Sequence, residues 1–320
     1  MLVCRVSHAE NANSIGIDAL TDIKNLPNLR YNEISKMVSS FDRSGGNRDF
    51  QADELGRQNY LYQENGNYVI FDEKRPGCIY RIWMTYFGLD DLDIVAGDAL
   101  FYFDHEQTPG FRTNLDPFFL GDINPFVWPL TGYWDTSSGG FFSYTPIEFK
   151  SALKIAVTEP PHYYNINYKL HNTDAELTSL DGSEDVSDAV DLLNSAGQSF
   201  PHDTFGLDSL EETITLAPNR EYRFDFNGPA QIMGLKVKLL NRIFEQDIFD
   251  YGKDLWIRAT WDNHEEADIN SPFYLFFGGG VKEVACKALL AGSHPATGEL
   301  YFYFPMPFAT HARIEVANEG

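Results

Sequence analysis

The sequence predicts an all-β fold, a duplicated (double) jelly-roll β-sandwich with few short helices. Aromatic residues make up 15% of the 320 residues, and 25 Gly and 16 Pro accompany them, a composition typical of strands joined by many turns. Apolar or alternating runs rich in β-branched and aromatic residues are bounded by Gly, Pro, Asn and Asp, which predicts strands. The clearest predicted strands are 101–106, 153–157, 164–170, 255–262 and 301–306, and the two predicted helices are 50–62 and 188–196.

Two halves of the chain carry the same motif. In each half an aromatic residue precedes Asp, an acidic cluster follows, and a Phe-Phe pair begins fourteen residues after the Asp, from Asp104 to Phe118 and from Asp262 to Phe276. Downstream, four apolar positions of residues 144–155 recur in residues 303–314. A repeat of this length indicates duplication of a whole domain, because solenoid repeats have periods of about 20–50 residues.

The repeat defines the expected domains. Residues 1–170 are expected to form the first jelly roll with an N-terminal segment, residues 171–219 an acidic connector, and residues 220–320 the second jelly roll. The strand predicted at 164–170 has no counterpart after the last repeated motif, so the second jelly roll is expected to lack its last strand. An unpaired sheet edge invites pairing, so either the chain is truncated or a neighbouring subunit covers that edge.

Charge and cysteine content limit the possible partners and setting. The net charge of −23 argues against nucleic acid and anionic membranes, which would repel the chain. Eleven acids and no Lys or Arg lie between Lys169 and Arg220, a pattern typical of a solvated linker. Three Cys without paired spacing indicate neither a disulfide framework nor a zinc site. With no signal-peptide or membrane-spanning apolar run, we expect a cytoplasmic protein.

Several linked motifs together resemble glycoside hydrolase family 172 over most of residues 16–318. They occur in the family's order and read SSFDRSGGNRDF (39–50), GCIYRIWMTYF (77–87), YFDHEQTP (102–109), SYTPIEFKSALKI (143–155), WDNHEEADINSPFYLFFGGG (261–280) and YFYFPMPF (301–308). The resemblance implies a double jelly roll assembled as a homotrimer or a hexamer, with the active site near a subunit interface. It also implies a carbohydrate substrate: α-linked furanosides, either fructofuranosides and difructose anhydrides or D-arabinofuranosides. Neither the resemblance nor the sequence indicates a cofactor or a metal site.

The resemblance implies a retaining mechanism with two catalytic glutamates in the second half. Glu283 lies where the family has the glutamate that closes its glycine-rich stretch. The family's other glutamate follows a Trp-Asp-Gly motif, and His264 occupies that position here. Glu265 follows directly, so a relocated acid at Glu265, altered chemistry at His264, and a member that no longer catalyses remain open. In an undistorted strand, Glu265 would face away from His264.

Two further groups of residues are candidates for substrate binding. Around the Gly-Gly turn of residues 45–46, the polar side chains of Asp42, Arg43, Asn47 and Asp49 are placed either to bind sugar hydroxyls or to clamp the turn. Trp261 adjoins the expected catalytic position and is a candidate for stacking on a sugar ring, and Asp262 accompanies it. Since Asp262 recurs as Asp104 in the first half, a role in the fold is an alternative for this residue.

Two hypotheses follow for the function. The favoured one is an enzyme, a glycoside hydrolase or transglycosidase that acts on α-furanosides through Glu283 and either Glu265 or His264. The alternative is a non-catalytic double-jelly-roll protein that binds carbohydrate or builds an assembly.

Overall fold

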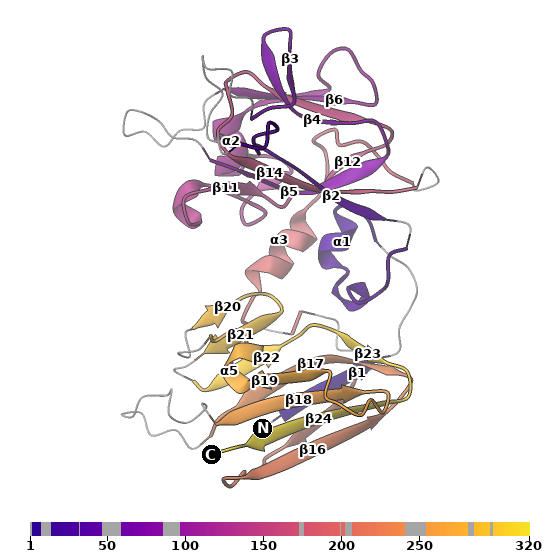
Figure 1. Ribbon diagram of the computed structural model, residues 1–320, viewed down its shortest axis with the longest axis vertical. Coiled ribbons are helices and arrows are strands. Elements are labelled where there is room, and N and C mark those ends of the chain that lie inside the picture. Colours follow the sequence, from indigo (N-terminus) through magenta and orange to yellow (C-terminus); the bar gives the residue numbers. More distant parts are fainter. Residues whose placement is uncertain are drawn as a thin grey trace. The chain divides into compact units, whose positions relative to one another are not determined.

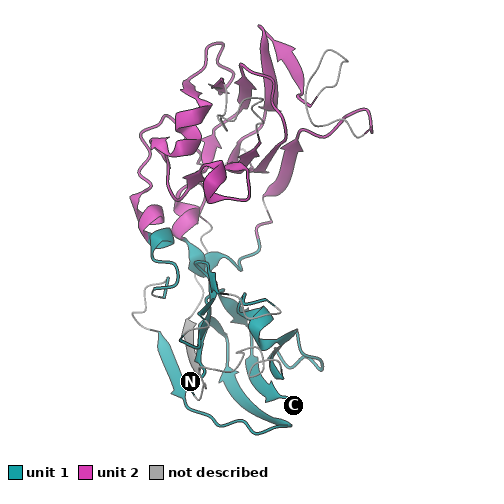
Figure 2. Ribbon diagram, turned by 90° about the vertical axis from the view of Figure 1, so that its left-hand side faces the viewer, with its two compact units in different colours: residues 1–13, 22–29, 192–320 teal, residues 14–21, 30–191 magenta. Residues whose placement is uncertain are grey.

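The computed structural model confirms the all-β fold, with antiparallel sheets and a few short helices (Figure 1). It divides into two compact units, shown in two colours in Figure 2. The first sandwich comprises Ser14–Thr21 and Arg30–Asp191, and the second comprises Met1–Asn13, Asp22–Leu29 and Leu192–Gly320. The structure describes the backbone of residues 2–7 and, with side chains, residues 14–31, 33–46, 59–85, 97–172, 176–198, 200–201, 207–240, 254–280, 285–294 and 297–320.

The first sandwich consists of two main sheets. One has the order β10-β11-β5-β14-β2, with β12 also paired to β5, and the other has the order β3-β4-β13-β6-β7. The strands of the first sheet are β2 (Ile34–Ser39), β5 (Gly77–Met84), β10 (Thr131–Gly132), β11 (Phe141–Ser143), β12 (Ile147–Phe149) and β14 (Tyr164–Leu170). Those of the second are β3 (Tyr62–Glu64), β4 (Asn67–Glu73), β6 (Asp98–Phe103), β7 (Phe111–Asn114) and β13 (Leu153–Val157).

Short elements complete the first sandwich. Strands β8 (Asp122–Ile123) and β9 (Phe126–Val127) form a hairpin, and α1 (Asp18–Thr21), α2 (Leu115–Leu120) and η2 (Trp134–Thr136) are the short helices. Helix α3 (Ser187–Asn194), whose residues divide between the two units after Asp191, confirms the helix predicted at 188–196. Residues 50–58 of the other predicted helix lie outside the described residues, and residues 59–62 are not helical.

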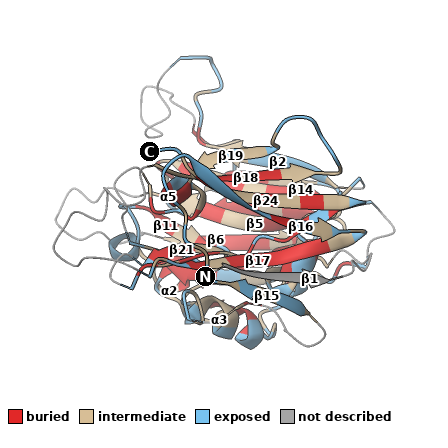
Figure 3. Ribbon diagram, turned by 90° about the horizontal axis from the view of Figure 1, so that it is seen from below, coloured by how far each residue is buried: buried red, intermediate tan, exposed pale blue. Residues whose placement is uncertain are grey.

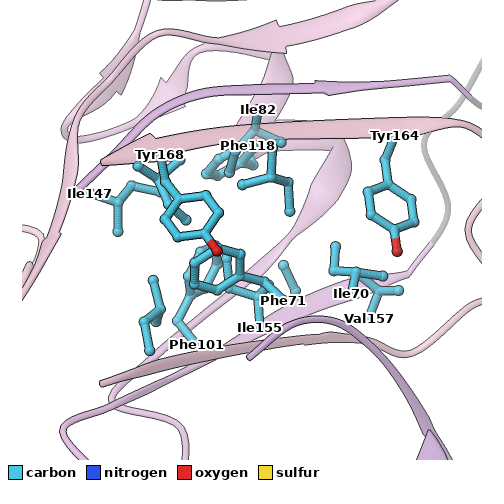
Figure 4. Close-up of a cluster of buried hydrophobic side chains, with 14 of the residues drawn as sticks. Ile70, Phe71, Ile82, Phe101, Phe118, Ile147, Ile155, Val157, Tyr164 and Tyr168 are labelled. Carbon is cyan, nitrogen blue, oxygen red and sulfur yellow. The ribbon is translucent and has the colours of Figure 1, made fainter. Parts of the chain in front are cut away.

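The core of the first sandwich lies between its two sheets (Figure 4). Strand β14 shows how the sequence builds it, because Tyr164, Ile166, Tyr168 and Leu170 are buried while the polar residues between them are half-exposed. The alternation matches the two-residue period of a strand that has one face on the core. Each large apolar side chain buried in this way contributes about 1.5–3 kcal/mol relative to its exposed state.

The second sandwich also has two sheets around its own apolar core. One sheet has the order β15-β1-β17-β22-β21-β20, with β23 also paired to β17, and the other has the order β16-β24-β18-β19. The strands are β1 (Leu2–Ser7), β15 (Asp208–Glu212), β16 (Arg220–Asn227), β17 (Ala230–Lys238), β18 (Leu255–Trp261), β19 (Ile269–Pro272), β20 (Cys286–Lys287), β21 (Ala291–His294), β22 (Glu299–Phe302), β23 (Met306–Phe308) and β24 (His311–Asn318). The short helices are η1 (Ile23–Asn25) and α5 (Phe273–Phe276).

The sheet edge that was expected to be open is occupied by the chain's own N-terminal strand. In the first sandwich β14 lies antiparallel between β2 and β5. In the second sandwich β1 lies antiparallel between β15 and β17 in the corresponding place. The expected missing strand is therefore supplied by residues 2–7, and this position in the sheet does not need a neighbouring subunit to fill it.

This arrangement also differs from the expected domain boundaries. The sequence predicts that the N-terminal segment belongs with the first jelly roll, whereas β1 pairs within the second sandwich. Part of the expected connector forms β15, the exposed edge strand beside β1, while the central strand β17 is buried along most of its length (Figure 3).

No helix among the described residues is long and apolar enough to cross a membrane.

The remaining strands of the two sandwiches also correspond in order. The order β2-β14-β5-β11-β10 matches β15-β1-β17-β22-β21, and β4-β13-β6-β7 matches β16-β24-β18-β19. The repeated Phe-Phe pair has the same geometry in both copies. The rings of Phe118 and Phe119 are 4.9 Å apart at 88°, and those of Phe276 and Phe277 are 5.0 Å apart at 88°. In both sandwiches this edge-to-face pair packs against the core.

Candidate functional site

The candidate catalytic residues His264 and Glu265 lie in a turn that follows β18. The strand ends at Trp261, and both Asp262 (φ 51°) and Asn263 (φ 62°) adopt the left-handed conformation. The backbone N–H of His264 donates to the carbonyl of Trp261 over 3.0 Å, which closes the turn. Asp and Asn tolerate this conformation better than most residues, so the local sequence favours a turn here.

Because the chain turns after Trp261, the expected strand alternation does not apply to the acidic cluster. Glu265 was expected to face away from His264 on an extended strand, but β18 ends three residues before His264 and β19 begins at Ile269. The expectation held for an undistorted strand, and that condition is not met, since the left-handed residues end the strand at Trp261. His264, Glu265 and Glu266 are all exposed to solvent.

The carboxylate of Asp262 accepts hydrogen bonds from residues of the same sandwich. It accepts hydrogen bonds from the backbone N–H groups of Thr310 at 2.6 Å and Ala309 at 2.9 Å, and from the Thr310 hydroxyl at 3.1 Å. These bonds, with the Thr310 N–H foremost, lower the pKa of Asp262 to about 2. Asp262 thus ties the turn after β18 to the turn before β24.

Asp104 makes the corresponding contacts in the first sandwich. Its carboxylate accepts from the Ser151 N–H at 2.7 Å and the Ser151 hydroxyl at 3.0 Å, and from the hydroxyl of Ser179. Partial burial opposes ionisation of Asp104, but the hydrogen bonds from Ser179 and Ser151 outweigh it, so its pKa is lowered. The repeated Asp therefore has the same structural role in both halves. This role explains why the Asp recurs, and no role in substrate binding is needed to explain it.

His264 is held by a partner that the sequence analysis did not identify. Its Nδ1 lies 2.7 Å from Oδ1 of Asp268, and the other oxygen of Asp268 accepts the backbone N–H of Trp261 at 2.9 Å. The Trp261 N–H and then His264 lower the pKa of Asp268, so this carboxylate is ionised at neutral pH. A carboxylate on Nδ1 fixes the orientation and the tautomer of an imidazole, which leaves Nε2 as the nitrogen for proton exchange. The four-residue spacing of His264 and Asp268 was the available sequence signal.

Trp261 is half-buried at the end of β18, where its ring packs partly against the core of the second sandwich. Stacking of a sugar on Trp261 stays a prediction. Glu283 lies outside the described residues, so its distance to the turn is not part of the structure. The described start of its motif, Phe277–Gly280, follows α5 and includes left-handed glycines at Gly278 and Gly280.

The candidate residues of the first sandwich clamp their own turn. Oδ1 of Asp42 accepts the backbone N–H of Ser44 at 2.9 Å and its hydroxyl at 2.6 Å. The guanidinium of Arg43 donates to the carbonyls of Ser39 at 3.0 Å and Phe41 at 3.3 Å, and lies 4.8 Å from the centre of the Phe41 ring. These contacts favour the structural alternative for Asp42 and Arg43. The other two candidates, Asn47 and Asp49, lie outside the described residues.

Two family models match the chain. A model described as the GH172 first beta-sandwich domain matches residues 31–188, and one described as GH172 domain-like matches residues 206–320. The chain belongs to GH172. Comparison with curated proteins finds no match. Membership of GH172 confirms the resemblance carried by the linked motifs and indicates a glycoside-hydrolase-type function.

Proposed function

We propose that this GH172 protein is a glycoside hydrolase or transglycosidase that cleaves α-linked furanosides with retention of configuration. The substrate class comprises α-fructofuranosides, difructose anhydrides and α-D-arabinofuranosides. Family membership supports the reaction class. The observation that carries the proposal is the pair of His264 and Asp268, 2.7 Å apart, at the position where the resemblance expects a catalytic carboxyl.

The chemistry assigns different roles to the two positions. A retaining glycosidase needs a nucleophile that forms a glycosyl-enzyme intermediate and a group that first donates and then accepts a proton. A carboxylate forms that ester, whereas an imidazole oriented by Asp268 is suited to proton transfer. We therefore assign the nucleophile to Glu283 and proton transfer to His264, with Glu265 as the alternative proton carrier.

The steps then balance. The Glu283 carboxylate attacks the anomeric carbon, and the bond between that carbon and the leaving oxygen breaks. The leaving oxygen takes the proton from His264. In the second step a water molecule, or a sugar hydroxyl in transfer, gives its proton back to His264 and attacks the anomeric carbon, which releases Glu283.

A substitution series tests the proposal on all three substrate types. Glu283→Gln is expected to abolish turnover, and His264→Asn is expected to lower kcat about 10²–10⁴-fold because it removes the proton carrier. Glu265→Gln should retain most activity if His264 carries the proton, and the reverse result would transfer the role to Glu265. Glu211→Gln, an exposed acid on β15, is the matched control. Full turnover by Glu283→Gln would overturn the proposal.

The alternative function is carbohydrate binding without turnover. The exposure of both His264 and Glu265 favours it, because catalytic acids of glycosidases usually lie in enclosed, apolar surroundings. Sugar binding by folded protein that cleaves none of the three substrate types would support this alternative. Furanoside cleavage that depends on Glu283 would exclude it.

We also propose that the protein self-associates as a trimer or a hexamer and that its two halves arose by duplication. The family resemblance supports the assembly, and the corresponding strand orders support duplication. Sedimentation velocity tests the assembly, and a monomer alone at micromolar concentration would contradict it.

A further inference from the structure

The outer face of the first sandwich carries a hollow of about 220 Å³ over strands β3, β4, β6 and β13. We call it the tyrosine hollow and define it by six of its lining residues, Tyr62, Asp72, Tyr102, Glu106, Gln107 and Lys154. It is distinct from the turn after β18, which belongs to the second sandwich. Nothing in the proposed reaction uses it.

The tyrosine side chains of the hollow are fixed by their neighbours. The hydroxyl of Tyr62 donates to Oδ2 of Asp72 over 2.6 Å, and 38% of the Tyr62 residue surface remains exposed. The ammonium of Lys154 lies 4.4 Å from the centre of the Tyr102 ring and pairs with Glu64. A ring that is already oriented and still exposed loses little conformational entropy when a ligand stacks on it.

The remaining lining residues supply both donors and acceptors. Glu106 and Gln107 follow β6 in an exposed turn, beside the charged groups of Asp72 and Lys154. Each hydroxyl of a sugar both donates and accepts a hydrogen bond, so carboxylate, amide and ammonium groups together suit it. Tyrosine rings suit the apolar face of the sugar ring. The chemistry therefore matches a neutral polyhydroxylated ligand better than an anion or an apolar one.

The size of the hollow limits the ligand. Pockets for drug-sized ligands usually measure about 300–1,000 Å³. At about 220 Å³ the tyrosine hollow suits a single sugar residue, either free or at the end of a chain.

The corresponding positions of the second sandwich carry different chemistry. Asp225 and Arg313 stand where the first sandwich has Asp72 and Lys154, and they form an ion pair at 3.0 Å. Thr260 occupies the place of Tyr102 opposite that Arg. The aromatic platform thus belongs to the first copy and is not a general feature of this strand arrangement.

We propose that the tyrosine hollow is a carbohydrate-binding site for one sugar residue, separate from the proposed catalytic turn. Tyr62 is the stacking platform, and Glu106, Gln107 and Asp72 bind hydroxyl groups. The proposal does not rest on turnover, since a sugar can bind here whether or not the chain cleaves it.

The test measures sugar binding at the tyrosine hollow through the ¹⁹F resonance of Tyr62. The full chain is labelled with 3-fluorotyrosine and titrated with D-fructose and with D-arabinose while ¹⁹F NMR spectra are recorded. The Tyr62 resonance is assigned by its disappearance in Tyr62→Phe. Tyr222 is the matched internal control, because it is 37% exposed on β16 and its hydroxyl donates to Glu212 over 2.6 Å. Its resonance is assigned in the same way from Tyr222→Phe.

We expect the Tyr62 resonance to shift saturably with at least one of the two sugars while the Tyr222 resonance stays in place. Glu106→Gln, an exposed change in the hollow, should weaken the apparent affinity about tenfold, which corresponds to about 1.4 kcal/mol. Equal movement of both resonances, no movement of Tyr62, or unchanged affinity in Glu106→Gln would each overturn the proposal. The Tyr62 resonance reports only on binding at the hollow. A failure of sugar binding there can therefore be distinguished from a failure of the proposed catalytic activity.

Discussion

The two sandwiches have corresponding strand orders but differ in what covers the outer face of one sheet. In the first, Leu100, Val69 and Ala156 form a small apolar cluster on that face, under Leu61 and Tyr102. In the second, Arg258 and Glu315 stand at the places of Leu100 and Ala156 and are bonded at 3.2 Å. The core-facing positions are apolar in both sandwiches, so the arrangement of strands depends on the core and leaves the outer face available for other chemistry.

Removal of residues 1–7 is expected to have the largest effect, and on the second sandwich only. It deletes β1 and leaves the facing edges of β15 and β17 unpaired. Each lost backbone hydrogen bond costs about 1 kcal/mol, so the second sandwich should lose several kcal/mol of stability. Hydrogen exchange should be faster in residues 230–238, most of all at the N–H groups that face β1, and protection of residues 164–170 should be unchanged.

A peptide with the sequence of residues 1–7 provides the control for this deletion. Added in excess, it should restore protection of β17 by strand addition, and a scrambled peptide should not. Unchanged protection of β17 after the deletion would contradict the placement of β1.

Leu100→Ala should destabilise the protein by about 2–3 kcal/mol. Leu100 is 6% exposed, so truncation loses buried apolar area and leaves a gap beneath Leu61 and Tyr102. The matched change at the corresponding position, Arg258→Ala, should cost about 1 kcal/mol or less because the ion pair is partly solvated. Urea denaturation of the two variants measures the difference, and equal losses would show that the two outer faces contribute alike.

The lowered pKa of Asp262 predicts that the free energy of unfolding depends on pH in the acidic range. The folded state lowers the pKa of Asp262 to about 2, below its ordinary 3.8. Its contribution is therefore complete above about pH 4 and is lost as the pH falls toward 2. The stability advantage of the native chain over Asp262→Asn, measured by urea midpoints from pH 5 to pH 2, should shrink over this range. A constant advantage would show that the charge of Asp262 does not stabilise the turn.

The smallest expected effect concerns the charged outer face of the second sandwich. Glu315→Gln removes the shared partner of Arg223 and Arg258 and should cost about 1 kcal/mol or less. The difference from the native chain should decrease at 1 M NaCl, because salt screens partly exposed ion pairs. A loss that is independent of salt would indicate packing of the Glu315 side chain instead of charge.

Much of this fold follows from local sequence patterns. The alternation in residues 164–170 predicts β14. The recurrence of Asp104 as Asp262 offers a role in the fold as the alternative to substrate binding, and the hydrogen bonds of both carboxylates favour that alternative. Local patterns do not reveal β1, because six residues at one end of the chain carry no signal for partners more than two hundred residues away.

The candidate site was less predictable than the fold. The left-handed turn at Asp262 and Asn263 replaces the expected strand and brings Asp268 to His264. The tyrosine hollow draws its residues from separate segments of the chain, so no single stretch of sequence contains its signal. Proximity in the tyrosine hollow arises from pairing between strands, which sequence spacing does not encode, whereas His264 and Asp268 meet through a local turn whose backbone conformation the strand pattern does not indicate.

The position of β1 has a consequence for the order in which the two sandwiches can fold during synthesis. During synthesis β1 leaves the ribosome before the first sandwich, whereas its partners β15 and β17 follow only after the whole first sandwich. The first sandwich can fold while the chain still grows, since domains fold as units from the N-terminal side. The second sandwich forms later, because it must pair β15 and β17 with a strand that precedes the first sandwich. The entropic cost of closing the long intervening loop grows only slowly with its length. Completion of the second sandwich thus requires β1 to remain accessible until β15 and β17 have emerged.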